Sequence, residues 1–166
     1  KGVEKFPSQE YFIGNLMDYY IQKGKIDEGL AQMDAILAKN STPYFMYVKG
    51  VLQYEKKDYE GAIATFNQII AEGKDFVAEA YSKIGDCSFF PAQEIVEENS
   101  KLSMDDPKYA TNEAKIKELY EKALPFYEKA KEAKPDNRQL WGQYLLNIYW
   151  KLDKEKYNAL EKELGY

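Results

Sequence analysis

The stretch KKDYEGAIATFNQII, residues 56–70, decides the fold of this chain. Its apolar residues recur at spacings of three and four, which is typical of one face of an α-helix. Ala62 is followed by Phe66 four positions on and by Ile69 three positions further on. The stretch therefore predicts a helix that presents a small residue, a ring and an aliphatic side chain to a neighbour.

This spacing recurs along the chain. The set Gly50, Ala62, Phe66 and Ile69 is matched one repeat earlier by Met17, Gly29, Met33 and Ile36, and the four-then-three spacing returns at Ala123, Tyr127 and Ala130. A small residue lets two helices approach closely, and the larger side chain beside it fills the gap. Because a short helix is marginal alone, the repeat predicts two-helix hairpins that cover one another's apolar faces.

The composition excludes several classes of protein. Net charge is −5, with Arg138 the one arginine, so the chain lacks the basic field that nucleic acid requires. The absence of histidine and the single cysteine, Cys87, remove histidine-dependent catalysis, histidine-ligated zinc and internal disulfides. No apolar run is long enough to span a membrane, and the compartment, cytoplasmic or periplasmic, cannot be read from the sequence.

The pattern resembles the tetratricopeptide repeat, a helical hairpin of about 34 residues. Residues 56–70 match the second helix of that repeat, and Tyr81, Ile84 and Gly85 match its first helix. The resemblance implies an all-α fold, a right-handed solenoid of helical hairpins with about four repeats. Lys49, Met17 and Leu145 depart from the usual residues of the family and weaken single repeats.

We expect one domain over residues 1–166, with repeats at about 10–42, 43–77, 78–137 and 138–166, the last acting as a cap. Pro7 stands where the final proline of a preceding repeat would stand. Residues 1–7 are accordingly interpreted as the tail of an upstream repeat, and the chain as the C-terminal part of a longer, bacterial-type array.

The third repeat carries an insertion. Gly85 and Ala123 are further apart than the corresponding pairs Met17 and Gly29 or Gly50 and Ala62, and the excess is about 26 residues. Apolar residues keep helical spacing on both sides of a polar turn near residues 99–107. We therefore expect two lengthened helices, which serve either as a partner-specific handle or as a tolerated extension.

In the family, the first helices of the repeats line a concave groove that takes a peptide or a partner's helix. Carried over by position, the groove residues are Tyr11, Asp18, Gln22, Tyr44, Tyr47, Val51, Tyr54, Glu55, Glu79, Ser82, Asp86, Phe89, Phe90, Gln139, Leu146 and Tyr149. Aromatic side chains are frequent in this set, and rings give large contact area at low entropic cost. Packing between hairpins is the competing role for many of them.

The resemblance implies a non-catalytic scaffold that binds a protein or peptide segment in an aromatic groove. The alternative is a carbohydrate- or lipid-binding accessory module that uses exposed Tyr and Phe rings. Capture of a C-terminal carboxylate is disfavoured, because Gly14 and the acidic Asp18 and Asp86 stand where that class presents basic donors. Arrays of this kind can also associate end to end with a second copy.

The sequence offers no catalytic constellation, cofactor motif or metal site. Adjacent carboxylates such as Asp105 and Asp106 are expected to be solvated, since neighbours on a helix or turn rarely face each other. Cys87 lies among apolar residues and is expected to be a buried, inert thiol. We therefore expect neither an enzyme nor a cofactor-binding protein.

Overall fold

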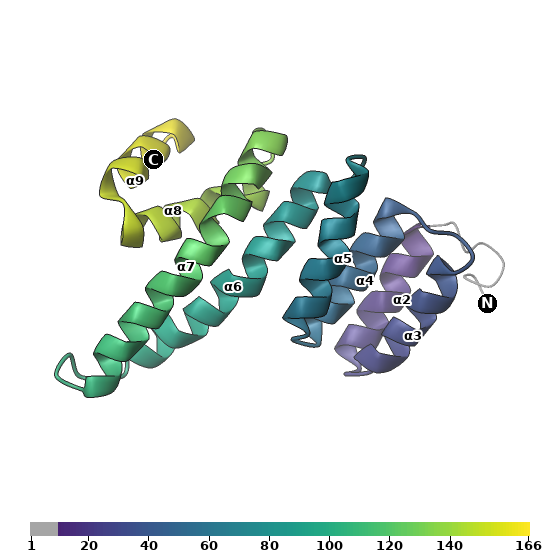
Figure 1. Ribbon diagram of the computed structural model, residues 1–166, viewed down its shortest axis with the longest axis horizontal. Coiled ribbons are helices and arrows are strands. Elements are labelled where there is room, and N and C mark those ends of the chain that lie inside the picture. Colours follow the sequence, from purple (N-terminus) through teal and green to yellow (C-terminus); the bar gives the residue numbers. More distant parts are fainter. Residues whose placement is uncertain (1–9) are drawn as a thin grey trace. The chain divides into compact units, whose positions relative to one another are not determined.

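The computed structural model describes residues 10–166, and this part of the chain is helical throughout, with no strand (Figure 1). The helices are α2 (Glu10–Gln22), α3 (Ile26–Leu37), α4 (Pro43–Glu55), α5 (Tyr59–Glu72), α6 (Val77–Asn99), α7 (Pro107–Ala133), the short 3-10 helix η1 (Arg138–Leu140), α8 (Gly142–Leu152) and α9 (Lys154–Leu164). The prediction of an all-α fold of helical hairpins is confirmed. The interpretation of residues 1–7 lies outside the described residues.

The chain divides into two compact units, with the boundary inside α6 between Ala80 and Tyr81. Unit 1 contains the hairpins α2–α3 and α4–α5, and unit 2 contains most of α6 together with α7, α8 and α9. The four helix pairs correspond in order to the four expected repeats. The single domain, the repeat boundaries and the superhelical path remain predictions.

The two hairpins of unit 1 turn in the same way. Gly24 and Lys57, which are equivalent positions of consecutive repeats, both have a left-handed backbone, with φ of 66° and 63°. The N–H that follows donates to the carbonyl of Tyr20 in the first turn and to that of Gln53 in the second, which are again equivalent positions. The repeat in sequence is therefore a repeat in backbone conformation, and Lys57 adopts a conformation that favours glycine.

Helix starts in unit 1 follow from short polar side chains. The Thr42 hydroxyl accepts a hydrogen bond from the N–H of Phe45, and Pro43 takes the first helical position of α4. The Asp58 carboxylate accepts from the N–H of Gly61 at the start of α5. These side chains satisfy N–H groups that have no partner within the helix.

The apolar faces of the first three helices in unit 1 form one core. Its buried members come from α2, α3 and α4, and are Ile13, Met17, Met33, Ile36, Phe45, Val48 and Leu52. The second hairpin closes on Phe66, whose ring is fully buried against Gly50. Burial of this apolar surface is the main term that stabilises the two hairpins against the entropy of ordering them.

Unit 2 is built on the lengthened hairpin. Helices α6 and α7 have 23 and 27 residues and continue through Pro91 and Pro125. At their far end, the Asn99 side chain donates to the backbone carbonyl of Tyr109 across the turn, and Asp106 caps α7. The two long helices expected from the insertion are confirmed.

The core of unit 2 lies where α8 and α9 pack on the lengthened hairpin. Its buried members are Phe89, Ala92, Ile116, Tyr120, Ala123, Tyr127, Ala130, Trp141, Leu145, Leu146, Ile148, Tyr149 and Leu160. The Trp141 indole is buried and donates to the carbonyl of Lys134, which fixes η1 beside the end of α7. Three residues expected to line the groove, Phe89, Leu146 and Tyr149, contribute to this core instead.

Candidate partner-binding groove

A hollow lies between α2 and α4 in unit 1. Its volume is about 230 Å³, and it is lined by Gly14, Met17, Asp18, Ile21, Tyr44, Tyr47, Val48, Val51 and Leu52. Four of these residues, Asp18, Tyr44, Tyr47 and Val51, are among those expected to line the groove. The hollow is therefore the place in unit 1 where several predicted groove residues meet.

Helical spacing produces this hollow. Gly14, Met17, Asp18 and Ile21 recur at the three-and-four spacing along α2, so they share one face. Residues 44, 47, 48 and 51 do the same along α4. Gly14 leaves the space open, because a Cβ at this position would lie 2.9 Å from the Tyr44 hydroxyl oxygen.

Two tyrosine rings of the hollow are held by other rings. Tyr47 stacks on Phe76, with centroids 5.4 Å apart and planes at 25°, and Tyr44 meets Phe76 at 5.7 Å. Tyr47 also contacts the buried Phe66 at 5.8 Å. Both tyrosines are half-buried. They pack within unit 1 and still present part of each ring to the hollow.

The hollow has one charged group, the Asp18 carboxylate. Asp18 is exposed, and within residues 10–166 no lysine or arginine forms an ion pair with it. All other lining residues are aromatic, aliphatic or glycine. This combination offers an apolar recess beside a negative charge.

The other predicted residues of unit 1 lie outside the hollow. Tyr11 is 76% exposed and touches Phe12, while Gln22 and Glu55 are exposed. Tyr54 is half-buried against Tyr59, and Glu79 is half-buried at the start of α6. Only some of the predicted groove residues of unit 1 therefore line the hollow.

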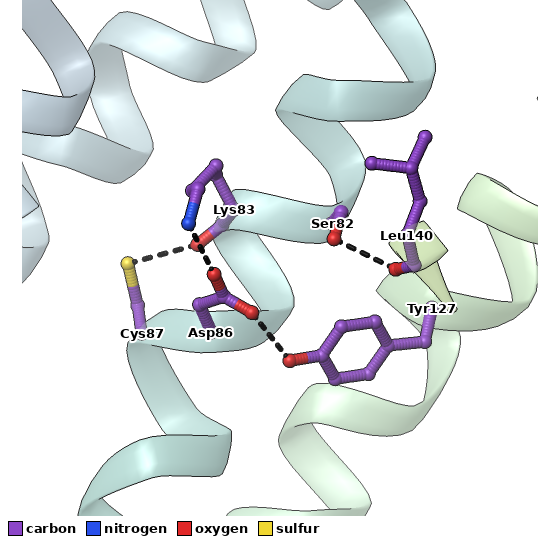
Figure 2. Close-up of polar contacts among 6 residues, drawn as sticks. All are labelled: Ser82, Lys83, Asp86, Cys87, Tyr127 and Leu140. Atoms are coloured by element: carbon purple, nitrogen blue, oxygen red, sulfur yellow. Dashed lines mark hydrogen bonds and ion pairs between the residues drawn. The ribbon is translucent and has the colours of Figure 1, made fainter. Parts of the chain in front are cut away.

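Several predicted groove residues of unit 2 are buried. Asp86 is 1% exposed; its carboxylate accepts a hydrogen bond from the Tyr127 hydroxyl and pairs with the Lys83 ammonium, both at 2.7 Å (Figure 2). The Ser82 hydroxyl donates to the carbonyl of Leu140 at 2.7 Å. These two side chains tie α6 to α7 and η1, so packing accounts for them.

The remaining predicted residues of unit 2 are mostly in the core. Phe89 stacks on Tyr120 and meets Tyr127 edge-on, while Phe90 is 39% exposed and meets Tyr144. Gln139 is exposed. Leu146 is buried, and so is Tyr149, whose hydroxyl donates to the Glu128 carboxylate at 2.7 Å.

Comparison with known families identifies the repeat. The tetratricopeptide repeat family matches residues 15–75, from within α2 to just beyond α5. Residues 15–75 of this chain are thus similar to tetratricopeptide repeats. The matched residues include eight of the nine that line the hollow. Repeats of this family present binding surfaces for other proteins and are typically non-catalytic scaffolds.

One solved structure is similar over nearly the whole length. It is a crystal structure of nearly identical TPR-like repeats of a putative kinesin light chain from Podosopora anserina. The likeness covers 98% of this chain and 94% of that chain, with 11% sequence identity and a TM-score of 0.44. No curated protein matches the sequence.

Cys87 is buried and behaves as a packing residue. Its thiol donates to the Lys83 carbonyl at 3.3 Å. Burial, with the nearby Asp86 carboxylate as a second cause, raises the pKa of this thiol to about 12. Because the thiolate is the reactive form, the thiol is protonated at neutral pH and is a poor nucleophile.

The described residues offer neither a metal site nor a membrane span. No three acidic or cysteine side chains in residues 10–166 gather closely enough to hold a metal ion. None of the helices there is long and apolar enough to cross a bilayer.

Sequence reasoning missed five residues of the hollow as site residues. Met17, Ile21, Val48, Leu52 and Gly14 lie within one helical turn of the predicted Asp18, Tyr47 and Val51. The signal was present in the three-and-four spacing of α2 and α4. This spacing identifies the residues that share one face of a helix. Which part of that face stays open depends on how α2 and α4 pack together.

Proposed function

We propose that the hollow between α2 and α4 binds a segment of a partner protein through an apolar side chain that is flanked by a basic residue. The recess between Gly14, Tyr44 and Val51 accepts the apolar side chain, and Asp18 pairs with the basic group. The observation that carries the proposal is the conjunction of an open apolar recess with one unpaired carboxylate.

The size of the hollow supports a side chain rather than a large ligand. Its volume of about 230 Å³ holds one large apolar side chain, whereas drug-sized ligands occupy pockets of roughly 300 to 1,000 Å³. The rings of Tyr44 and Tyr47 are fixed by Phe76, so little side-chain entropy is lost on binding. Rigid aromatic walls of this kind are typical of binding hot spots.

The charge of the hollow supports a basic neighbour in the bound segment. Asp18 stands at the recess without a cation among the described residues, and the whole chain has a net charge of −5. A lysine or arginine next to the anchoring side chain would complement this field and speed association.

A displayed library of random peptides, selected on the full chain, tests the proposal. We expect the selected peptides to share an aliphatic or aromatic residue within two positions of Lys or Arg. Gly14→Leu fills the recess and should weaken binding of the selected peptides by at least about tenfold, measured by fluorescence anisotropy.

Asp18→Lys distinguishes the charge from the recess. This variant should reverse the selected preference, from basic to acidic flanking residues, while the apolar anchor is retained. Ala64→Leu on α5, at an exposed position outside the hollow, is the matched control for Gly14→Leu. Equal binding by Gly14→Leu and the control would overturn the proposal, as would a library that yields no common anchor.

A further inference from the structure

A second hollow lies in unit 2, between α8 and α9. Its volume is about 280 Å³, and its lining residues are Gln143, Leu146, Asn147, Trp150 and Tyr157. None of these residues belongs to the unit 1 hollow, and only Leu146 was expected to lie in the groove. This hollow has a different chemistry, with two amides and two aromatic side chains.

Trp150 is one of several exposed large apolar residues of unit 2, and it borders the hollow. It is 54% exposed, whereas the other tryptophan, Trp141, is 1% exposed in the core. An exposed indole beside a hollow is available for stacking, because its face carries the negative part of the ring quadrupole. The C–H groups on one side of a sugar ring carry the complementary partial positive charge.

The two amides stand on the same face of α8 as this ring. Gln143, Asn147 and Trp150 follow at spacings of four and three, so they lie one above another along the helix. The Asn147 amide donates to the carbonyl of Gln143 at 2.8 Å, which holds the Asn147 side chain in place and leaves its oxygen available as an acceptor. The Gln143 side chain has no hydrogen bond within residues 10–166.

Each amide group offers both donors and an acceptor, so the pair suits a ligand with several hydroxyl groups. A bound peptide would need apolar contact instead, and the one aliphatic side chain in the lining, Leu146, is 7% exposed. These features favour a carbohydrate over a protein segment.

A cation stands at the rim of the hollow. The Lys154 ammonium lies 4.4 Å from the centroid of the Trp150 ring and 5.2 Å from that of Tyr157. Among the described residues no carboxylate pairs with it. The ammonium thus lies over the Trp150 ring, where it can pair with an anionic group of a ligand that packs against the indole.

We propose that the hollow between α8 and α9 binds an acidic sugar, such as a uronic acid residue of a polysaccharide. Trp150 stacks on the sugar ring, Gln143 and Asn147 hydrogen-bond its hydroxyl groups, and Lys154 pairs with its carboxylate. This site is independent of the proposed peptide site in unit 1.

Calorimetric titration of the full chain with an oligosaccharide of glucuronic acid, and with its carboxyl-reduced neutral counterpart, tests the proposal. We expect the acidic form to bind at least about tenfold more tightly at low salt, with the preference falling as salt is added. Trp150→Ala should weaken binding of both forms by about tenfold or more. Lys154→Gln should remove the preference for the acidic form and leave binding of the neutral form unchanged.

Two control variants accompany these titrations. Tyr11→Ala removes an exposed ring from unit 1, and Lys162→Gln removes an exposed lysine from another turn of α9; neither should alter binding. Absence of binding by either oligosaccharide, or undiminished binding by Trp150→Ala, would overturn the site. Equal affinity for the acidic and neutral forms would overturn the role of Lys154 and the assignment to acidic sugars.

Discussion

The α4–α5 hairpin of unit 1 and the α6–α7 hairpin of unit 2 close on a ring in the same way. In unit 1, a Cβ added at Gly50 would lie 2.6 Å from the Phe66 ring. In unit 2, a Cβ added at Gly85 would lie 2.8 Å from the Tyr127 ring. Both rings are fully buried, so in both hairpins glycine gives the space into which the ring packs.

The two buried rings differ by one oxygen atom, the Tyr127 hydroxyl, and this atom requires a hydrogen-bond partner. The Tyr127 hydroxyl needs an acceptor in the core, and Asp86 supplies it. The buried carboxylate in turn needs a cation, which Lys83 supplies. In unit 1, Val51 has the position of Asp86 relative to the glycine, and Val48 has the position of Lys83. Both valines line the hollow. The comparison teaches that a tyrosine in place of phenylalanine brings a charge pair into the hairpin.

Removal of either ring is expected to have the largest effect. Phe66→Ala and Tyr127→Ala should each lower the free energy of unfolding by about 3 to 5 kcal/mol, because each leaves a cavity in a closed core. Tyr127→Ala should be the more costly, since it also leaves Asp86 without its donor. Urea unfolding followed by circular dichroism measures both, and a cheaper Tyr127→Ala would contradict the role of Asp86.

The glycines come next. Gly50→Ala and Gly85→Ala each force a methyl group into a ring that is already packed, and we expect a cost of about 1 to 3 kcal/mol for each. Gly24, where no atom lies within 4 Å of an added Cβ, is a different case, because its cost would come from the backbone conformation. Two neutral results at Gly50 and Gly85 in urea melts would show that the rings have room to move.

The contribution of the Tyr127 hydroxyl can be tested separately from that of its ring. Tyr127→Phe removes the hydroxyl and should cost about 1 to 3 kcal/mol, because a buried carboxylate loses a hydrogen bond. Adding Asp86→Val removes the carboxylate that has lost its donor, places a valine where unit 1 has Val51, and should recover part of that cost. The double-mutant cycle in urea measures the coupling, and purely additive effects would mean that the two side chains do not act together.

Alkaline pH should lower the stability of the chain through buried tyrosines of unit 2, and this effect is expected to be smaller than those of the substitutions above. Burial raises the pKa of Tyr120, Tyr144 and Tyr149, all in unit 2, and the Glu128 carboxylate adds to the increase at Tyr149. A tyrosine whose folded pKa is raised contributes stability that is complete below its unfolded pKa of about 10 and declines as pH rises above it. These tyrosines should therefore lower stability from about pH 10 upward, in addition to the loss from Cys87, whose raised pKa begins to cost stability from about pH 8.5.

Tyr149→Phe provides the control for this decline. It should unfold with a smaller dependence on pH above about 10, which thermal melts at a series of pH values would measure alongside tyrosinate absorbance. An unchanged pH dependence would exclude Tyr149 as a source of the alkaline loss.

The sequence predicted the architecture because the repeating spacing reflects contacts that every hairpin must make. Gly29, Ala62 and Ala123 fall at helix contacts, and the Gly24 and Lys57 turns share one conformation. Depth of burial was harder to predict. The spacing places Val51 and Asp86 at the same position of their helices, yet Val51 lines an open hollow and Asp86 lies in the core.

The reason lies in partners that are distant in sequence. Asp86 is covered by a residue 41 positions away, and Ser82 by the carbonyl of Leu140, 58 positions away. The insertion also brings long helices beside α8, so Phe89 becomes part of a ring cluster with Tyr120 and Tyr144. A pattern within one repeat carries no information on such contacts.

The single thiol, Cys87, allows local opening of the chain to be measured by chemical labelling. It lies on α6 next to Asp86, and its raised pKa leaves little thiolate while the helix is packed. A small thiol reagent can therefore label the native chain only when a local opening exposes Cys87. The labelling rate at this single native thiol would give the free energy of the local opening, and comparing variants at Tyr127 or Gly85 would show whether those contacts stabilise α6 around Cys87.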